Sequence, residues 1–135
     1  MQYNLLSLYD DLESNGVDVY NWNVKGTSAC TLASEECTSI FIDYNQIKTE
    51  AEETCILAHE YGHFATGTTH QLCSPLELVS RHEYKANKIA IKRLLPIQKI
   101  LFALQKGIKE TWELADYFNL TEDFVCMALD YYGLK

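Results

Sequence analysis

Hydrophobic and polar positions alternate in an early part of the chain, as they do in strands that bury one face. Between residues 17 and 22, two valines alternate with Tyr20 and Trp22. The run 38–43 is rich in β-branched and aromatic residues and predicts a second strand. A further short strand is expected at 29–32. These segments together predict a small N-terminal sheet.

Helical spacing of the hydrophobic residues governs the rest of the chain. The leucines expected to form the stripe of a first helix are Leu5, Leu6, Leu8 and Leu12. Gly67 fits a helix end, Ser74 and Pro75 fit the start of the next helix, and Pro96 fits a break. Helices are therefore expected over residues 1–14, 49–66, 74–95, 97–106, 111–118 and 121–132.

A sheet placed early and helices placed late predict the α+β class. The chain has 135 residues, which fits one domain with a core of its own. Hydrophobic residues make up 47% and charged residues 22%, which excludes a disordered chain. We therefore expect a single domain over 1–135, in which about 97–135 form a helical C-terminal subregion.

The net charge of −8 narrows the class of partner. An acidic surface repels phosphate backbones, so direct binding of nucleic acid is not expected. The same charge keeps a protein soluble and would attract a basic protein partner.

Five cysteines without a CxxC pair do not form the pattern of a disulfide framework. Reduced thiols in a reducing compartment are the simpler interpretation. The first residues lack the features of a signal peptide, and no apolar run approaches the length of a membrane span. A cytoplasmic protein is therefore expected.

The strongest chemical signal is an H-E-x-x-H motif inside the helix expected at 49–66. His59 and His63 are four residues apart, so both imidazoles lie on one helix face and can bind one metal ion. This spacing suits Zn²⁺, which binds imidazole nitrogen. Glu60 follows the first histidine and is expected to be the general base that takes a proton from the attacking water. A helix with two surface histidines is the non-functional alternative.

A catalytic zinc needs a third protein ligand. The metzincin spacing is excluded because Thr66 and Thr69 occupy its glycine and histidine positions. The remaining candidates are His70, Cys73, Glu77, His82 and Glu83.

Glu83 is the preferred third ligand. It lies twenty residues after His63 on a separate expected helix, far enough for that helix to pack antiparallel across the first. Asn87 lies four residues later on the same face, where it can hydrogen-bond a metal-binding histidine from outside, as in E-x-x-x-D sites of the thermolysin type. A solvated helix face is the alternative for this pair.

The motif and its surroundings resemble the ImmA/IrrE family of metallo-endopeptidases. The resemblance is carried by Cys55-Ile-Leu-Ala-His-Glu-Tyr-Gly-His63, by Glu83-Tyr-Lys-Ala-Asn87, and by the upstream strand Ile40-Phe-Ile-Asp43. The stretch 111–125 is similar to the C-terminal part of members found in phages, prophages and mobile elements of Gram-positive bacteria. The resemblance spans most of residues 37–135.

The resemblance implies a zincin-like α+β fold, with the sheet packed on the HExxH helix and an edge strand able to bind extended substrate. It maps zinc ligands to His59, His63 and Glu83, and the catalytic glutamate to Glu60. Relatives cleave helix-turn-helix repressors, so a basic repressor is the expected partner. The alternative is a non-catalytic zinc-containing module that binds or sequesters a repressor or antitoxin.

Other features are assigned structural roles. Residues 111–131 mimic a helix-turn-helix, but the second helix has acidic side chains and no basic ones, so DNA binding is not expected. Cys55 is expected to be a small buried hydrophobe. A basic cluster of Lys85, Lys88, Lys92 and Arg93 is expected to be a solvated face. Candidates for stabilising the oxyanion or lining the cleft are Tyr44, Tyr61, His70 and His82.

Overall fold

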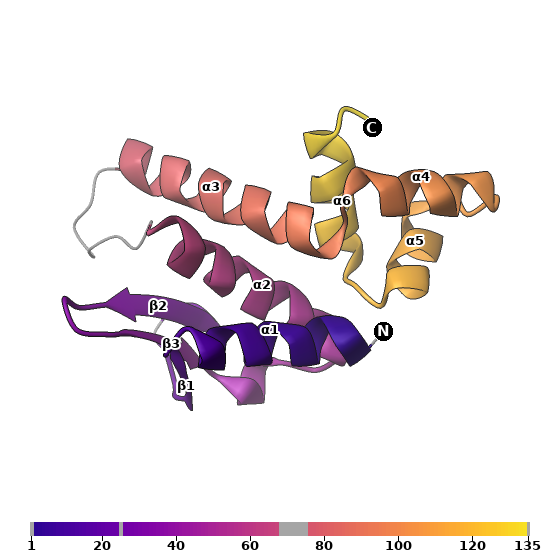
Figure 1. Ribbon diagram of the computed structural model, residues 1–135. Coiled ribbons are helices and arrows are strands. Elements are labelled where there is room, and N and C mark those ends of the chain that lie inside the picture. Colours follow the sequence, from indigo (N-terminus) through magenta and orange to yellow (C-terminus); the bar gives the residue numbers. More distant parts are fainter. Residues whose placement is uncertain (1, 25, 68–75, 135) are drawn as a thin grey trace.

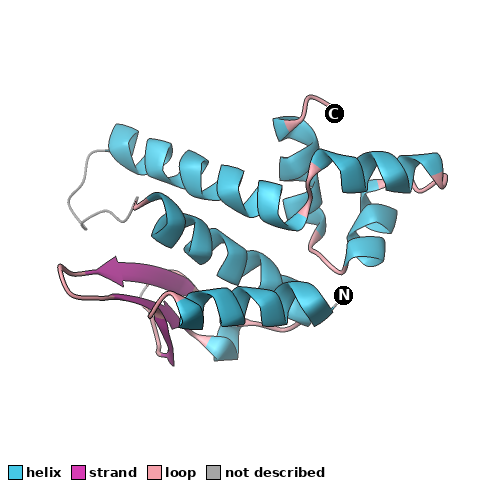
Figure 2. Ribbon diagram, in the orientation of Figure 1, coloured by secondary structure: helices cyan, strands magenta, loops and turns pink. Residues whose placement is uncertain are grey.

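The computed structural model describes residues 2–24, 26–67 and 76–134, and the side chains of 4–24, 26–67 and 80–134. Strands gather at one end of the molecule and helices form the rest (Figure 2). This arrangement confirms the α+β class. The elements are α1 (Gln2–Ser14), β1 (Asp18–Asn21), β2 (Ala29–Ala33), β3 (Thr38–Ile42), η1 (Tyr44–Gln46), α2 (Glu50–Thr66), α3 (Leu76–Leu94), α4 (Ile97–Gln105), α5 (Thr111–Phe118) and α6 (Glu122–Tyr131).

The sheet has three strands in the order β1-β3-β2, with β1 parallel and β2 antiparallel to β3. All three strands were expected. Its inner face carries Ile40 and Ile42, which are fully buried. Its outer face carries the Tyr20 and Phe41 rings, stacked with centroids 5.4 Å apart, and the exposed Trp22. The period-two alternation of the sequence therefore separates a core face from a solvent face.

Helix α1 packs on α2 and confirms the expected N-terminal helix, except at one leucine (Figure 1). Leu8 and Leu12 are fully buried, but Leu6 is 61% exposed. Leu5, Leu8 and Leu12 follow the three- and four-residue steps of one helix face, whereas Leu6 is turned about 100° from Leu5. The inclusion of Leu6 in the helical stripe was therefore wrong.

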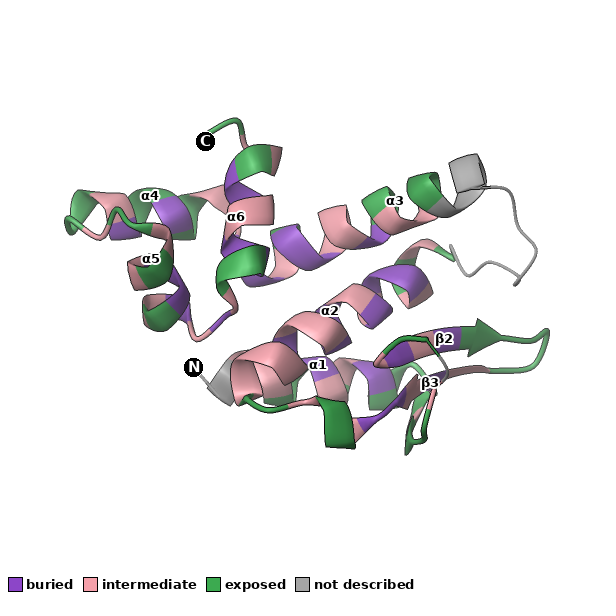
Figure 3. Ribbon diagram, turned by 180° about the vertical axis from the view of Figure 1, so that it is seen from behind, coloured by how far each residue is buried: buried purple, intermediate pink, exposed green. Residues whose placement is uncertain are grey.

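Helices α2 and α3 run antiparallel and form the centre of the molecule (Figure 1). Thr49 caps the start of α2 by accepting a hydrogen bond from the Glu52 backbone N–H, and Gly67 ends the helix in the left-handed conformation at φ 65°. The expected start signals of α3, Ser74 and Pro75, lie outside the described residues. Seen from the other side, α2 lies between α3 and the sheet and carries buried positions along its length (Figure 3).

The C-terminal helices extend from the end of α3 as expected. Pro96 precedes α4, and Asn119 ends α5 in the left-handed conformation at φ 54°. Thr121 caps α6 and also donates to the Cys55 thiol of α2 at 3.6 Å. Because α6 packs against α3, the helix-turn-helix-like segment is part of the core.

A short 3-10 helix, η1, follows β3 and was not expected. Asp43 is 3% exposed and begins this turn by accepting a hydrogen bond from the Asn45 backbone N–H. Its carboxylate also accepts from Asn23 Nδ2 at 3.1 Å and Gln46 Nε2 at 2.9 Å. Asp43 therefore joins the end of β3 to the segment after β1.

Among the described residues, no helix combines the length and the apolar character that crossing a membrane requires.

Candidate metal centre

His59 and His63 face each other on the side of α2 that meets α3. Their Nε2 atoms are 3.1 Å apart, and their rings meet edge to face with centroids 4.7 Å apart. His63 is 5% exposed, so its position is held by packing. The four-residue spacing therefore brings two imidazole nitrogens to one point.

Glu83 reaches this point from α3. Its Oε2 is 2.6 Å from Nε2 of His59, and its Oε1 is 3.2 Å from Nε2 of His63. In the described part of the chain, these three residues form a group whose ligand atoms lie within 4.8 Å of one another. The structure thus brings together the two histidines and the glutamate proposed from the sequence.

Asn87 lies behind this group. Its Oδ1 is 2.7 Å from Nδ1 of His59. An amide oxygen can only accept, so the Nδ1–H of His59 is the donor of this hydrogen bond. That hydrogen bond selects the tautomer in which Nε2 of His59 carries a lone pair toward Glu83 and His63.

Two imidazole nitrogens and one carboxylate are the donor set of a catalytic zinc site that leaves one position open. Ligand nitrogens about 2.0–2.1 Å from a tetrahedral ion lie about 3.3 Å apart. The observed 3.1 Å between the Nε2 atoms of His59 and His63 is close to that separation, as is the 3.2 Å from Glu83 Oε1 to Nε2 of His63. Glu83 Oε2 lies nearer, 2.6 Å from Nε2 of His59, so this carboxylate would bind the ion through Oε1 or after a small side-chain shift. The residues present therefore fit a metal ion of this kind.

Gly62 allows α3 to approach α2 closely. A Cβ atom added at Gly62 would lie 2.8 Å from Cα of Ala86, and closer still to the Ala86 carbonyl oxygen. The obstacle is backbone, so a side chain at this position would force the helices apart. A glycine inside a helix costs about 1 kcal/mol relative to alanine. Its position between two motif histidines was the sequence signal for this close approach, and sequence analysis missed it.

Replacing Gly62 by alanine should move α3 and weaken the metal site. We expect the free energy of unfolding of the metal-free protein to fall by about 1–3 kcal/mol, as overpacking does. Urea unfolding measures this loss. Ala65→Leu, which adds volume at an exposed position of α2, is the control and should be nearly neutral. Because the obstacle is the Ala86 backbone, Ala86→Gly should not rescue Gly62→Ala; rescue would contradict this packing explanation.

Glu60 projects from α2 toward β2. The Glu60 side chain is buried, and its Oε1 accepts a hydrogen bond from Thr31 Oγ1 at 2.7 Å. Thr31 was not singled out from the sequence. The available signal was a polar residue two positions after Ala29, on the face that strand alternation assigns to the core.

Tyr61 lies apart from the group. It is turned about 200° from His59 around α2. Its ring packs under the guanidinium of Arg93, 4.9 Å from the ring centroid. Arg93 also pairs with Asp11 and donates to Ser7 Oγ of α1 at 2.8 Å. Arg93 therefore joins α3 to α1 rather than belonging to a solvated face, and that part of the basic-cluster interpretation was wrong.

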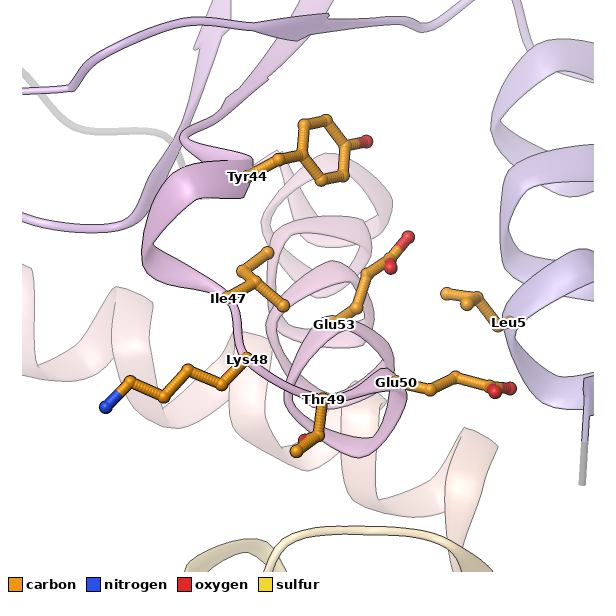
Figure 4. A pocket seen from close by; sticks show the side chains of 7 residues that line it. All are labelled: Leu5, Tyr44, Ile47, Lys48, Thr49, Glu50 and Glu53. Atoms are coloured by element: carbon orange, nitrogen blue, oxygen red, sulfur yellow. The ribbon is translucent and has the colours of Figure 1, made fainter.

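Tyr44 also lies apart from the group, beside a pocket of about 420 Å³ at the N-terminal end of α2 (Figure 4). Tyr9 donates a hydrogen bond to Glu53 at 2.6 Å and contacts the Tyr44 hydroxyl at 2.7 Å. Burial and the contact with Glu53 raise the pKa of Tyr9 far above its ordinary value, so Tyr9 stays neutral. The pocket is lined by Leu5, Tyr44, Ile47, Lys48, Thr49, Glu50 and Glu53, none of which belongs to the His–His–Glu group.

The remaining candidates are only partly covered. His70 and Cys73 lie outside the described residues, and the side chain of Glu77 is not described. His82 is partly buried and precedes Glu83 on α3, but it does not belong to the group. Burial raises the pKa of the Cys55 thiol, which disfavours the thiolate that metal binding needs.

Comparison with known proteins places the chain in a family. The model of the peptidase M78 family, described as an IrrE N-terminal-like domain, matches residues 16–130. The chain belongs to this family. Membership in the M78 family confirms the resemblance drawn from the motif and supports a peptidase. Searches of curated proteins and of solved structures gave no match.

Proposed function

We propose that this M78 family member is a zinc-dependent endopeptidase. The observation that carries the proposal is the convergence of His59, His63 and Glu83 from two helices, with Glu60 beside the first histidine. This combination supplies a three-ligand metal site and a candidate general base.

The residues divide the chemistry among them. Zinc bound at this group would supply a Lewis acid for the scissile carbonyl and would lower the pKa of the attacking water. Glu60 takes a proton from that water and returns it to the nitrogen of the leaving amine. Asn87 keeps His59 in the tautomer that binds metal through Nε2.

Strand β2 supports binding of an extended substrate. Just before and just after β2, Ser28 O accepts from Asp43 N–H and Ser34 N–H donates to Cys37 O. In the register of β2 and β3, these two bonds mean that the even-numbered positions of β2 also bond to β3. In an antiparallel pair the positions between them turn their backbone groups the other way. These positions are Ala29, Thr31 and Ala33. Since β2 is an edge strand next to Glu60, a substrate backbone added there would lie beside the general base.

We propose a helix-turn-helix repressor of a phage or mobile element as the substrate. The support is the resemblance of most of residues 37–135 to a family whose known members include repressor-cleaving proteases. The net charge of −8 also favours encounter with a basic DNA-binding protein. A cytoplasmic location follows from the same proposal, because such a repressor acts there.

The protein should cleave a helix-turn-helix repressor encoded beside its gene and leave most other proteins intact. Zinc-loaded protein is incubated with that repressor and with a cytosolic extract, each with and without chelator. We expect chelator to stop cleavage and the extract to remain largely undigested. Raising salt from about 50 to about 300 mM should slow cleavage by about tenfold, because screening weakens steering.

Two results would contradict parts of this proposal. Broad degradation of the extract would exclude selectivity. Repressor cleavage that is indifferent to salt would exclude electrostatic steering. Casein serves as the control substrate and should be cut poorly under every condition.

A further inference from the structure

The Glu60 carboxylate is held by a residue outside the motif. Glu60 is 6% exposed and Thr31 is 8% exposed, so their hydrogen bond lies in the interior between α2 and β2. At 2.7 Å, the contact has the length of a strong O–H···O bond to a carboxylate. A buried carboxylate without such a donor would be costly. The hydrogen bond from Thr31 therefore stabilises the Glu60 carboxylate in its buried position.

We propose that Thr31 is a positioning residue for Glu60. The proposal rests on the endopeptidase function proposed above and adds a residue that acts through the general base. Thr31 binds Oε1 of Glu60, which leaves Oε2 as the oxygen to take the proton. Thr31 thereby selects which carboxylate oxygen serves as the base and fixes its direction.

Thr31 is itself held rigidly. It pairs with Ile40 in the register of β2 and β3, and Ile40 is fully buried. A β-branched side chain has few χ1 choices in a strand. Its Oγ1 also lies 3.4 Å from the Glu60 backbone carbonyl oxygen. The strand and the restricted χ1 angle therefore fix the position of the Thr31 hydroxyl independently of Glu60.

The same residue can align the substrate with the base. Thr31 is one of the three positions of β2 whose backbone groups turn away from β3. A substrate strand added at this edge would bond to the backbone of the residue whose hydroxyl holds Glu60. Thr31 would then bind the substrate through its backbone and Glu60 through its side chain, and so set the distance between the scissile bond and the base.

The activity test uses zinc-loaded protein and the helix-turn-helix repressor proposed above as its substrate. Thr31→Val keeps the shape of the side chain but removes the hydroxyl. We expect kcat to fall by about tenfold or more with KM nearly unchanged, because a misplaced base loses rate without losing binding. Thr31→Ser should restore most of kcat. Thr54→Val is the matched control: Thr54 is buried on α2 and donates to the Glu50 carbonyl at 2.9 Å, so its loss should leave kcat unchanged.

A second test needs no activity. In the metal-free protein, Thr31→Val should lower the melting temperature by about 3 °C or more, because Glu60 loses its buried donor. The same change should have little effect when Glu60 is already alanine. If Thr31→Val does not fold, Thr31→Ala takes its place in both tests.

The outcomes separate the two proposals. Wild-type kcat in Thr31→Val, or equal melting shifts with and without the Glu60 side chain, would overturn the positioning role. A wild-type protein that fails to cut the repressor would overturn the proposed function instead. In that case, the melting cycle still decides whether Thr31 holds Glu60.

Discussion

Glu60→Gln should retain the fold and the metal but lose repressor cleavage by at least about 100-fold, the range for loss of a general base. Glutamine keeps the shape of the side chain and can still accept the hydrogen bond of Thr31 through its amide oxygen. It cannot take a proton from water at neutral pH. Cleavage rates, zinc content and melting temperature of the variant and the wild type are the measurements.

Glu50→Gln is the matched control, because Glu50 is on the same helix but lines the pocket beside Tyr44. It should cleave at the wild-type rate. Undiminished proteolysis in Glu60→Gln would exclude the mechanism. A wild-type protein that binds the repressor tightly without cutting it, and a Glu60→Gln variant that does the same, would favour the sequestering module.

The helices, the strands and the His59–His63 pair were accessible from the sequence because each depends on local spacing. Four residues separate His59 from His63, and that interval sets their geometry in any helix. The position of Glu83 needed one further assumption, that the two helices pack antiparallel. The structure satisfies this assumption through Gly62, whose missing side chain lets the backbones approach.

The contacts of Thr31, Tyr61 and Arg93 depend on tertiary packing and could not be predicted from the sequence. Nothing in the sequence around Thr31 indicates that its hydroxyl contacts Glu60, because the two residues lie 29 positions apart and on different elements. Tyr61 was one of several cleft candidates, yet neighbouring motif positions point to different sides of a helix, and its ring packs against Arg93 instead. Arg93 looked like part of a basic surface, but its partners on α1 are more than eighty residues away.

Glu83→Ala should remove metal from the protein while leaving most of the fold. We expect zinc affinity to fall by more than about 100-fold, since even an outer residue that orients a ligand contributes about 10–100-fold. His59→Ala should act similarly. Asn87→Ala should lose about 10–100-fold, because it removes only the hydrogen bond that orients His59. Competition with a chromogenic chelator measures each affinity.

His82→Ala is the control that distinguishes the assigned ligands from a neighbouring candidate. His82 precedes Glu83 on α3 and was a possible third ligand, but it does not belong to the group that the structure brings together. Its replacement should leave zinc affinity within about threefold of wild type, the scale of a change under 1 kcal/mol. If His82→Ala lost zinc while Glu83→Ala kept it, the third ligand would have been misassigned. If both kept it, the site would not depend on α3, and the close packing at Gly62 would have no role in holding the metal.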